Sequence, residues 1–297
     1  MPEPDGRHAG VARYYDRNTR RFLLVGGGRG SHSIHRELWG PGVSSARDAV
    51  RHIDRLIADE IGALAAQPPP ALVDFGCGVG GTLLQLAERF PDARLHGVTI
   101  SAVQVESAKQ LARRAGVADR CTFTHGDYCA VDLGVRATAV VAIESMAHGA
   151  DIDAFLGNAA RHLGPRGALI VVDDFLAAPL SSLGEAGRRR VDQLRAGWQL
   201  HGLCTAEHVV AEAARHRLSL RKDLDLSGYT RPGSRVRDHL VALASPVLDR
   251  LGLSRVPFFG NMIGGNALQI GLENGYIRYK MLVFEAAAGS EAEAAPG

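Results

Sequence analysis

Short β-branched runs alternate with helical segments from residue 71 to residue 173 of this chain. The strands that this pattern predicts are Ala71–Phe75, Arg94–Thr99, Cys121–His125, Ala137–Ile143 and Ala168–Asp173. The helices that it predicts between them are Gly80–Phe90, Ser101–Ala115 and Ile152–Leu163. Strands separated by helices join in parallel through crossovers, so the pattern predicts an α/β fold with a doubly wound, Rossmann-like and mostly parallel sheet.

The flanking segments are predicted to be helical and to lie outside this core. Three prolines at 68–70 cannot continue a helix, so they end a leader in which a glycine-rich stretch precedes a helix at Val43–Ala66. Further helices are expected at 180–204, 206–216 and within 233–271, with strands at 218–226 and 275–284. We therefore expect an N-terminal helical lid (1–67), a cofactor-binding core (68–179), insertions and last strands over the substrate site (180–285) and a disordered tail (286–297).

Composition narrows the classes of partner. The 34 Lys and Arg nearly balance 32 Asp and Glu, so no chain-wide basic field favours nucleic acid. Four irregularly spaced cysteines form no metal pair and no disulfide framework, and no apolar run reaches the ~20 residues that span a bilayer. The opening segment also lacks the order of a signal peptide. These observations predict a cytoplasmic protein without a membrane span or a nucleic-acid partner.

A glycine-rich turn joins the first predicted strand to its helix. Gly76, Gly78 and Gly81 satisfy GxGxxG, which by itself is also compatible with a merely tight strand–helix junction. A dinucleotide site needs a carboxylate near the end of the second strand, and 96–101 contains none. Asp74 instead places a carboxylate beside the loop, where a cationic amino group would bind well.

These residues carry a family resemblance. The motif Asp74-x-Gly76-x-Gly78 resembles the first motif of class I S-adenosylmethionine-dependent methyltransferases, and Asp127 follows the third strand where that family contacts the adenine amino group. The phrase at 97–101 with Gln104 resembles the subset that methylates carbon, which includes cyclopropane fatty acid synthases and sterol and terpene diphosphate methyltransferases. The cofactor-binding residues that the resemblance implies are Tyr14, Tyr15, Asp74, Gly76, Gly78, Thr99, Ile100, Gln104, Asp127 and Tyr128. As bare residues, Asp127 could instead form a turn, although contact with the cofactor is favoured, and the two tyrosines could equally be core aromatics.

A candidate base follows the fourth strand. Glu144-Ser-x-Met is similar to the stretch that holds the catalytic glutamate of geranyl diphosphate C-methyltransferases, and 35–40 and 275–280 resemble other segments of that family. The resemblance places Trp39 against a prenyl chain. We expect burial in a partly dry crevice to raise the pKa of Glu144 and make it a better base.

The resemblance implies methyl transfer to an alkene carbon of a prenyl diphosphate. The alkene would attack the sulfonium methyl group, aromatic faces such as Trp39, Trp198, Tyr15 or Phe22 would stabilise the carbocation, and Glu144 would remove a proton. The residues expected to bind the diphosphate, together with Mg²⁺ whose protein ligands are unknown, are Arg29, His32, His35 and Arg36.

Several alternatives stay open at this point. The two tryptophans could anchor the leader and the insertion, and the basic loop at 29–36 could be a solvated surface run. His148 or His201 could be the base of an oxygen or nitrogen methyltransferase, and Asp173-Asp174 could be a metal pair or ordinary strand-end acids. A non-catalytic S-adenosylmethionine-binding protein and a homo-oligomer paired through lid helices are also compatible with the sequence.

Overall fold

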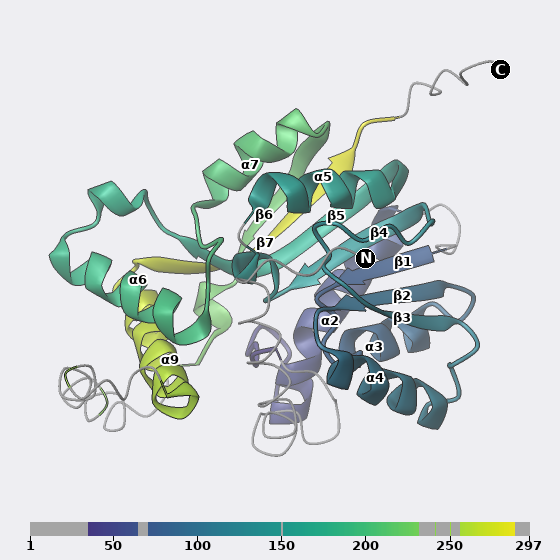
Figure 1. The fold of residues 1–297 in the computed structure, drawn as a ribbon, viewed down its shortest axis with the longest axis horizontal. Helices are drawn as coiled ribbons and strands as arrows, with labels where there is room; N and C mark the ends of the chain where they lie inside the picture. Colours follow the sequence, from purple (N-terminus) through teal and green to yellow (C-terminus); the bar gives the residue numbers. More distant parts are fainter. Residues whose placement is uncertain are drawn as a thin grey trace.

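Seven strands form a single sheet in the order β3-β2-β1-β4-β5-β7-β6 (Figure 1). The fold comes from a computed structural model, which describes residues 35–64, 71–149, 151–231 and 256–288 together with Val241 and Arg250. The strands are β1 (Ala71–Phe75), β2 (Arg94–Thr99), β3 (Cys121–His125), β4 (Ala137–Ile143), β5 (Leu163–Leu176), β6 (Leu218–Asp225) and β7 (Ile277–Ala286). Strands β1 to β5 pair in parallel, and β7 runs antiparallel to both of its neighbours. The predicted α/β, doubly wound and mostly parallel sheet is confirmed.

Helices cover both faces of the sheet (Figure 1). One face carries α2 (Ala46–Leu64), α3 (Gly81–Arg89) and α4 (Ala102–Arg114), and the other carries α5 (Ile152–His162) and α7 (Ala206–Arg215). Two more helices, α6 (Glu185–Trp198) and α9 (Pro257–Glu273), pack against each other to one side of the sheet. Short 3-10 helices lie at Met146–His148 (η1), Leu180–Ser182 (η2) and Ser227–Tyr229 (η3).

Local signals explain why these elements begin where they do. Every residue of β1 is buried, as expected for a central parallel strand covered on both faces. Ser101, Asp151 and Thr205 each cap the helix that follows by accepting the backbone N–H three residues on. The bounds predicted for β1 to β4 are confirmed residue by residue.

The bounds of strand β5 differ from the prediction. Strand β5 was expected at 168–173, but it spans Leu163–Leu176, because β4 pairs with it from Ala137↔Leu163 and β7 pairs with it from Leu176↔Ile277 to Ala168↔Glu285. Antiparallel pairing with a distant segment leaves no local signal, so periodicity underestimates such a strand. The predicted helix of the leader is confirmed as α2, whereas residues 1–34 lie outside the described part.

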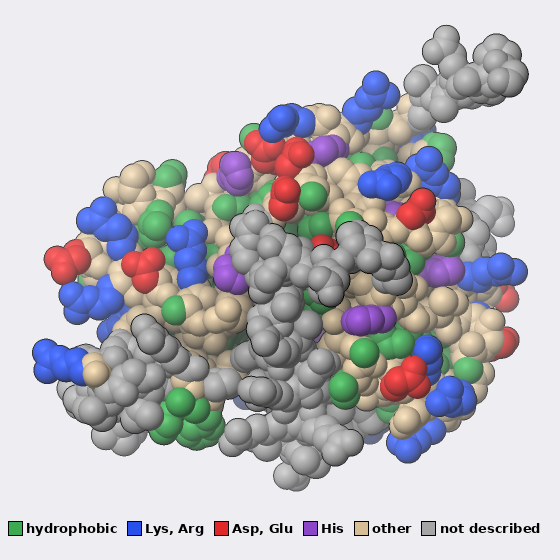
Figure 2. Space-filling view, in the orientation of Figure 1, with side chains coloured by type: hydrophobic (Ala, Val, Ile, Leu, Met, Phe, Trp, Pro, Cys, Tyr) green, Lys and Arg blue, Asp and Glu red, His purple; other side chains and the backbone are tan. Residues whose placement is uncertain are grey.

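The surface charge and the length and apolarity of the helices bear on which partners the protein can have. On the face drawn in Figure 2, Lys and Arg side chains are interspersed with Asp and Glu side chains over the described surface. Among the described helices, none is both long and apolar enough to cross a membrane.

Candidate active site

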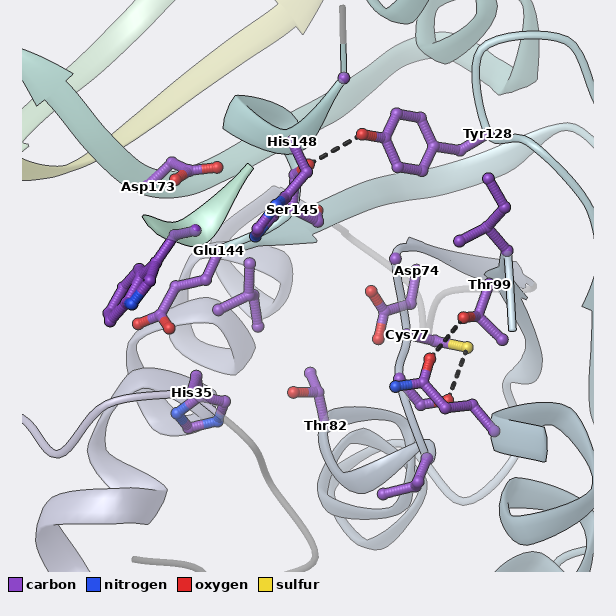
Figure 3. Close-up of a pocket in the computed structure, with 18 of the residues that line it drawn as sticks. His35, Asp74, Cys77, Thr82, Thr99, Tyr128, Glu144, Ser145, His148 and Asp173 are labelled. Atoms are coloured by element: carbon purple, nitrogen blue, oxygen red, sulfur yellow. Dashed lines mark hydrogen bonds between the residues drawn. The ribbon is translucent and has the colours of Figure 1, made fainter. Parts of the chain in front are cut away.

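A cavity of about 400 Å³ opens at the carboxyl ends of the central strands. It lies around the point where the order of the sheet reverses, between β1 and β4, which is where open α/β sheets bind ligands. The sequence-predicted residues that line it are His35, Arg36, Asp74, Gly76, Gly78, Thr99, Ile100, Gln104, Asp127, Tyr128, Glu144 and Trp198. In Figure 3, Thr99 and Tyr128 lie on one side of this cavity and His35 and Glu144 on the other, with Asp74 between them.

Other predicted residues are not brought to the cavity by the described structure. Tyr14, Tyr15, Phe22, Arg29 and His32 lie outside the described residues. His201 is exposed and does not line the cavity, although the prediction of an oxygen or nitrogen methyltransferase had offered it as a base.

Trp39 also lies away from the cavity, where a contact with a prenyl chain had been expected. Its indole N–H donates to Glu37 at 3.1 Å, and the Arg231 guanidinium stacks 3.2 Å from the ring centroid. Its backbone N–H donates to Tyr229 O at 2.7 Å. These contacts hold the segment before α2 against the segment that follows β6, which is the anchoring role left open above.

The glycine turn brings β1 and β4 into close contact. Gly76 has φ +88°, and a Cβ there would lie 2.4 Å from the Ser145 Cβ. The Ser145 hydroxyl donates to Phe75 O at 2.6 Å. A side chain at position 76 would therefore separate the two strand ends that form the cavity floor.

Asp74 is a buried carboxylate beside this turn. It is 3% exposed, and within the described residues no hydrogen bond reaches its side chain. Burial, followed by the nearby charge of Asp54, raises the pKa of Asp74 to about 7, and His35 opposes the rise. A ligand cation in the cavity would therefore relieve an unfavourable burial.

Polar side chains end β2 and β3 at the same edge. The Thr99 hydroxyl donates to Gln104 Oε1 at 2.6 Å, so hydroxyl and amide lie where a dinucleotide fold keeps a carboxylate. Asp127 Oδ1 accepts the Cys129 N–H at 2.8 Å, so this residue forms a turn as well as lining the cavity. Tyr128 donates its hydroxyl to Ser145 O at 2.8 Å, which fixes its ring at the cavity wall.

Glu144 follows β4 directly and has an unusual backbone. Its φ of +48° is in the left-handed region, which costs a non-glycine residue about 1–3 kcal/mol and is characteristic of functional sites. One carboxylate oxygen, Oε1, accepts the backbone N–H of Arg36 at 3.1 Å, the Arg36 Nε–H at 2.9 Å and the Tyr279 hydroxyl at 2.8 Å. The side chain is 22% exposed, so the cavity reaches the carboxylate.

The predicted rise of the Glu144 pKa is wrong. Burial alone would raise this pKa, but the charges of Arg36 and His35 and the hydrogen bonds from Arg36 and Tyr279 outweigh it and hold the pKa below its usual value. The carboxylate is therefore ionised at lower pH than expected. Burial is only one of the effects on this pKa, and the opposing cation and hydroxyl come from segments far from Glu144 in the sequence.

Arg36 joins Glu144 to a second carboxylate. Its Nη1 and Nη2 donate to the two oxygens of Asp174 at 3.0 and 2.6 Å, while its Nε donates to Glu144. The guanidinium also stacks 4.0 Å from the centroid of the Tyr279 ring. Arg36 was expected to bind a diphosphate, but three of its N–H groups and its charge are already used within the protein.

Asp173 and Asp174 both accept hydrogen bonds within the protein. Asp173 accepts the backbone N–H groups of Ala147 at 3.1 Å and Asp174 at 2.8 Å, and burial followed by the Asp174 charge raises its pKa to about 7. Within the described residues no group of three or more His, Cys, Asp or Glu is arranged to hold a metal ion. The pair is better described as strand-end acids.

Two histidines, His35 and His148, line the cavity together with Glu144. Burial lowers the pKa of His148 to about 4, so its imidazole is neutral near pH 7. Burial would also lower the pKa of His35, but Asp54, whose Oδ1 lies 3.4 Å from His35 Nε2, and Glu144 raise it above its usual value.

Trp198 forms the cavity wall contributed by the α6–α9 pair. Its indole N–H donates to Asn261 O at 3.3 Å, and both residues line the cavity. The two helices cross closely because Gly197 faces α9, where a Cβ would lie 2.4 Å from Gly260 O. Trp198 therefore both anchors the insertion and faces the cavity.

Sequence reasoning missed Tyr279 and Asp54. Tyr279 is fully buried in β7, and Asp54 is a buried carboxylate on the inner face of α2. A tyrosine in an apolar strand and an aspartate in the apolar stripe of a helix were the available signals, because buried polar groups require partners.

Comparisons with known proteins show which kind of domain contains this cavity. Residues 72–167 match the family described as a methyltransferase domain. Cycloartenol-C-24-methyltransferase 1 of Oryza sativa is 32% identical over 48% of this chain and 39% of its own length. The 27-O-demethylrifamycin SV methyltransferase of Amycolatopsis mediterranei is 29% identical over 67% of this chain and 71% of its own. The chain spans less than half the length of several other curated relatives that it matches.

A solved structure supports the same fold. Geranyl diphosphate C-methyltransferase from Streptomyces coelicolor, in complex with Mg²⁺, geranyl-S-thiolodiphosphate and S-adenosyl-L-homocysteine, has a TM-score of 0.70 at 20% identity, covering 96% of this chain and 100% of that one. Residues 72–167 therefore match a methyltransferase domain, and the chain resembles class I S-adenosylmethionine-dependent methyltransferases, sterol C-methyltransferases among them.

Proposed function

We propose that the protein transfers a methyl group from S-adenosylmethionine to an alkene carbon of a prenyl diphosphate. The observation that carries the proposal is Glu144, an ionised carboxylate that faces a largely apolar cavity from the end of β4. An ionised base near an apolar substrate is what the removal of a proton from a carbocation requires.

The cofactor side of the cavity fits S-adenosylmethionine. Asp74 would bind the amino group of the cofactor, since its buried carboxylate faces the cavity without a hydrogen-bond partner among the described residues. Thr99 and Gln104 would bind the ribose hydroxyls, and Asp127 with Tyr128 and Ile100 would enclose the adenine. When bound, the cofactor supplies an electrophilic methyl group on a sulfonium.

The side of the cavity that Glu144 and Trp198 line, which we call the reaction side, fits an alkene acceptor. Attack by the alkene on the methyl group would form a new C–C bond while the S–CH₃ bond breaks, its electron pair staying on the sulfur of released S-adenosylhomocysteine, and would leave a cation on the other alkene carbon. The face of Trp198 would stabilise that cation, by about 2 kcal/mol when desolvated. Glu144 would then take a neighbouring proton, and the electron pair of that C–H bond restores an alkene.

The diphosphate is expected to arrive with its own metal ion. His35 and Arg36 line the cavity, but both already face carboxylates, and the described residues offer no metal site. We propose that Mg²⁺ enters as part of the substrate, bound to diphosphate oxygens, and that Arg29 and His32 provide further positive charge.

A substrate panel tests this proposal. We expect labelled methyl transfer to one or more of the C5, C10, C15 and C20 prenyl diphosphates, with loss of turnover in EDTA and unchanged affinity for S-adenosylmethionine. The corresponding prenyl alcohols, which keep the alkene but lack the diphosphate, are the matched controls. Equal turnover of the alcohols in EDTA would show that the substrate carries no phosphate.

One observation favours a second candidate, an oxygen methyltransferase. His148 lines the cavity as a neutral imidazole, the form in which histidine removes a proton from a hydroxyl group. The similar methyltransferase of Amycolatopsis mediterranei is named for 27-O-demethylrifamycin SV, a compound that lacks a methyl group on an oxygen. Retained turnover in Glu144→Gln together with lost turnover in His148→Ala would favour this candidate.

A further inference from the structure

The two oxygens of Glu144 have different surroundings. Oε1 accepts the three hydrogen bonds described above, which come from Arg36 and Tyr279. Among the described residues, none donates a hydrogen bond to Oε2. Because three donors occupy Oε1 on the protein side, the carboxylate presents Oε2 to the cavity.

The sheet register explains why the donors converge. Asp174 on β5 pairs directly with Tyr279 on β7, so their side chains lie on the same face of the sheet. Arg36 lies over both, with its fork on the Asp174 carboxylate and its plane on the Tyr279 ring. Two segments far apart in the sequence therefore hold one oxygen of Glu144, and Asp174 from a third segment holds Arg36.

We propose that Glu144 takes the substrate proton on Oε2, and that Arg36, Tyr279 and Asp174 are positioning residues that fix Oε1. Asp174 acts indirectly, through the two hydrogen bonds that orient the Arg36 guanidinium. The inference deepens the proposed function and rests on it. It also gives Arg36 a role in orienting the base, in place of diphosphate binding.

The charges around Glu144 agree with this arrangement. Arg36 and His35 face it from the segment before α2, His148 from η1, Asp173 and Asp174 from β5, and Tyr279 from β7. The donors and cations lower the pKa of Glu144 despite its burial. Loss of the Tyr279 hydroxyl should therefore raise this pKa, whereas loss of a neighbouring negative charge should not.

Tyr279→Phe is the first test, because it removes only the hydroxyl. We expect the acidic limb of the kcat profile, and the ¹³C NMR titration of the Glu144 carboxyl, to move upward by about one to two pH units. Turnover at pH 7 should fall by about threefold or more, with little change in KM. Tyr276→Phe is the matched control, since the Tyr276 ring packs against Gly187 on the α6 side and not against Glu144.

Asp174→Asn is the second test, and its expected sign differs. It removes a negative charge near Glu144 and loosens Arg36, so kcat should fall while the acidic limb stays in place or moves down. Asp223→Asn, in the exposed ion pair with Lys280, is its control. If the two substitutions only loosened the site, the acidic limbs of Tyr279→Phe and Asp174→Asn would move in the same direction. That result would contradict the inference.

The NMR titration needs no substrate, so it separates two failures. An unchanged Glu144 titration in Tyr279→Phe would overturn the positioning role and leave the proposed base in place. Full turnover in Glu144→Gln would instead overturn the proposed base, and with it the role of Oε2.

Discussion

Glu144→Gln is expected to lower kcat by about two to four orders of magnitude. The amide keeps the size of the side chain, and its oxygen can still accept from Arg36 and Tyr279, but it cannot take a proton. The carbocation then has no base to remove its proton, so the product alkene does not form. Affinities for S-adenosylmethionine and for the acceptor should change little, as single-turnover kinetics and binding calorimetry would measure.

The pH profile provides a second readout for this variant. Because the pKa of Glu144 lies below its usual value, the acidic limb of wild-type kcat should lie at lower pH than an ordinary glutamate base would give, and the Gln variant should lack this limb. Glu106→Gln, in the exposed ion pair with Lys109 on α4, is the matched control. A Glu144→Gln enzyme within threefold of wild type would assign the base elsewhere, with His148 the next candidate.

Asp74→Asn is expected to weaken S-adenosylmethionine binding by about two to three orders of magnitude, the usual cost of removing one partner from a buried charge pair. The sheet should remain folded, because Asn has the same shape and Asp74 makes no hydrogen bond with the described residues. Calorimetry should show the loss, and Asp92→Asn in the exposed turn before β2 should bind like the wild type.

The raised pKa of Asp74 makes cofactor binding depend on pH. Below about pH 7 the cofactor-free carboxyl is protonated, so the wild-type affinity should fall by up to about tenfold per pH unit as the pH decreases. Asp74→Asn should lose this dependence. The variant keeps Asp173, so an undiminished pH dependence in Asp74→Asn would assign the titration to Asp173 instead.

Much of the cofactor side was predictable because its signals are local. Strand ends place Asp74, Thr99 and Asp127 at one edge of a parallel sheet, and sequence periodicity located these ends to the residue. The glycine turn needs a positive φ at Gly76, which the sequence provides directly.

The reaction side was less predictable because its contacts are long-range. Arg36 and Tyr279 lie 108 and 135 residues from Glu144 in the sequence, and neither periodicity nor spacing brings them together. The same limit applies to Trp39, because Arg231, from the segment after β6, stacks on its indole ring. Family resemblance gave the positions of Arg36, Glu144 and Trp39, but neither Tyr279 nor the contacts that set their charge and orientation.

The position of the transferred methyl group tests the central claim most directly. The enzyme would be incubated with S-adenosylmethionine carrying a ¹³CD₃ group and with the prenyl diphosphate that the panel identifies, and the product would be examined by ¹³C NMR and mass spectrometry. The account predicts an intact CD₃ group bound to carbon, with one substrate proton lost from a carbon that adjoins the cationic centre. A CD₃ group bound to oxygen or nitrogen, or no transfer to any prenyl diphosphate, would contradict it.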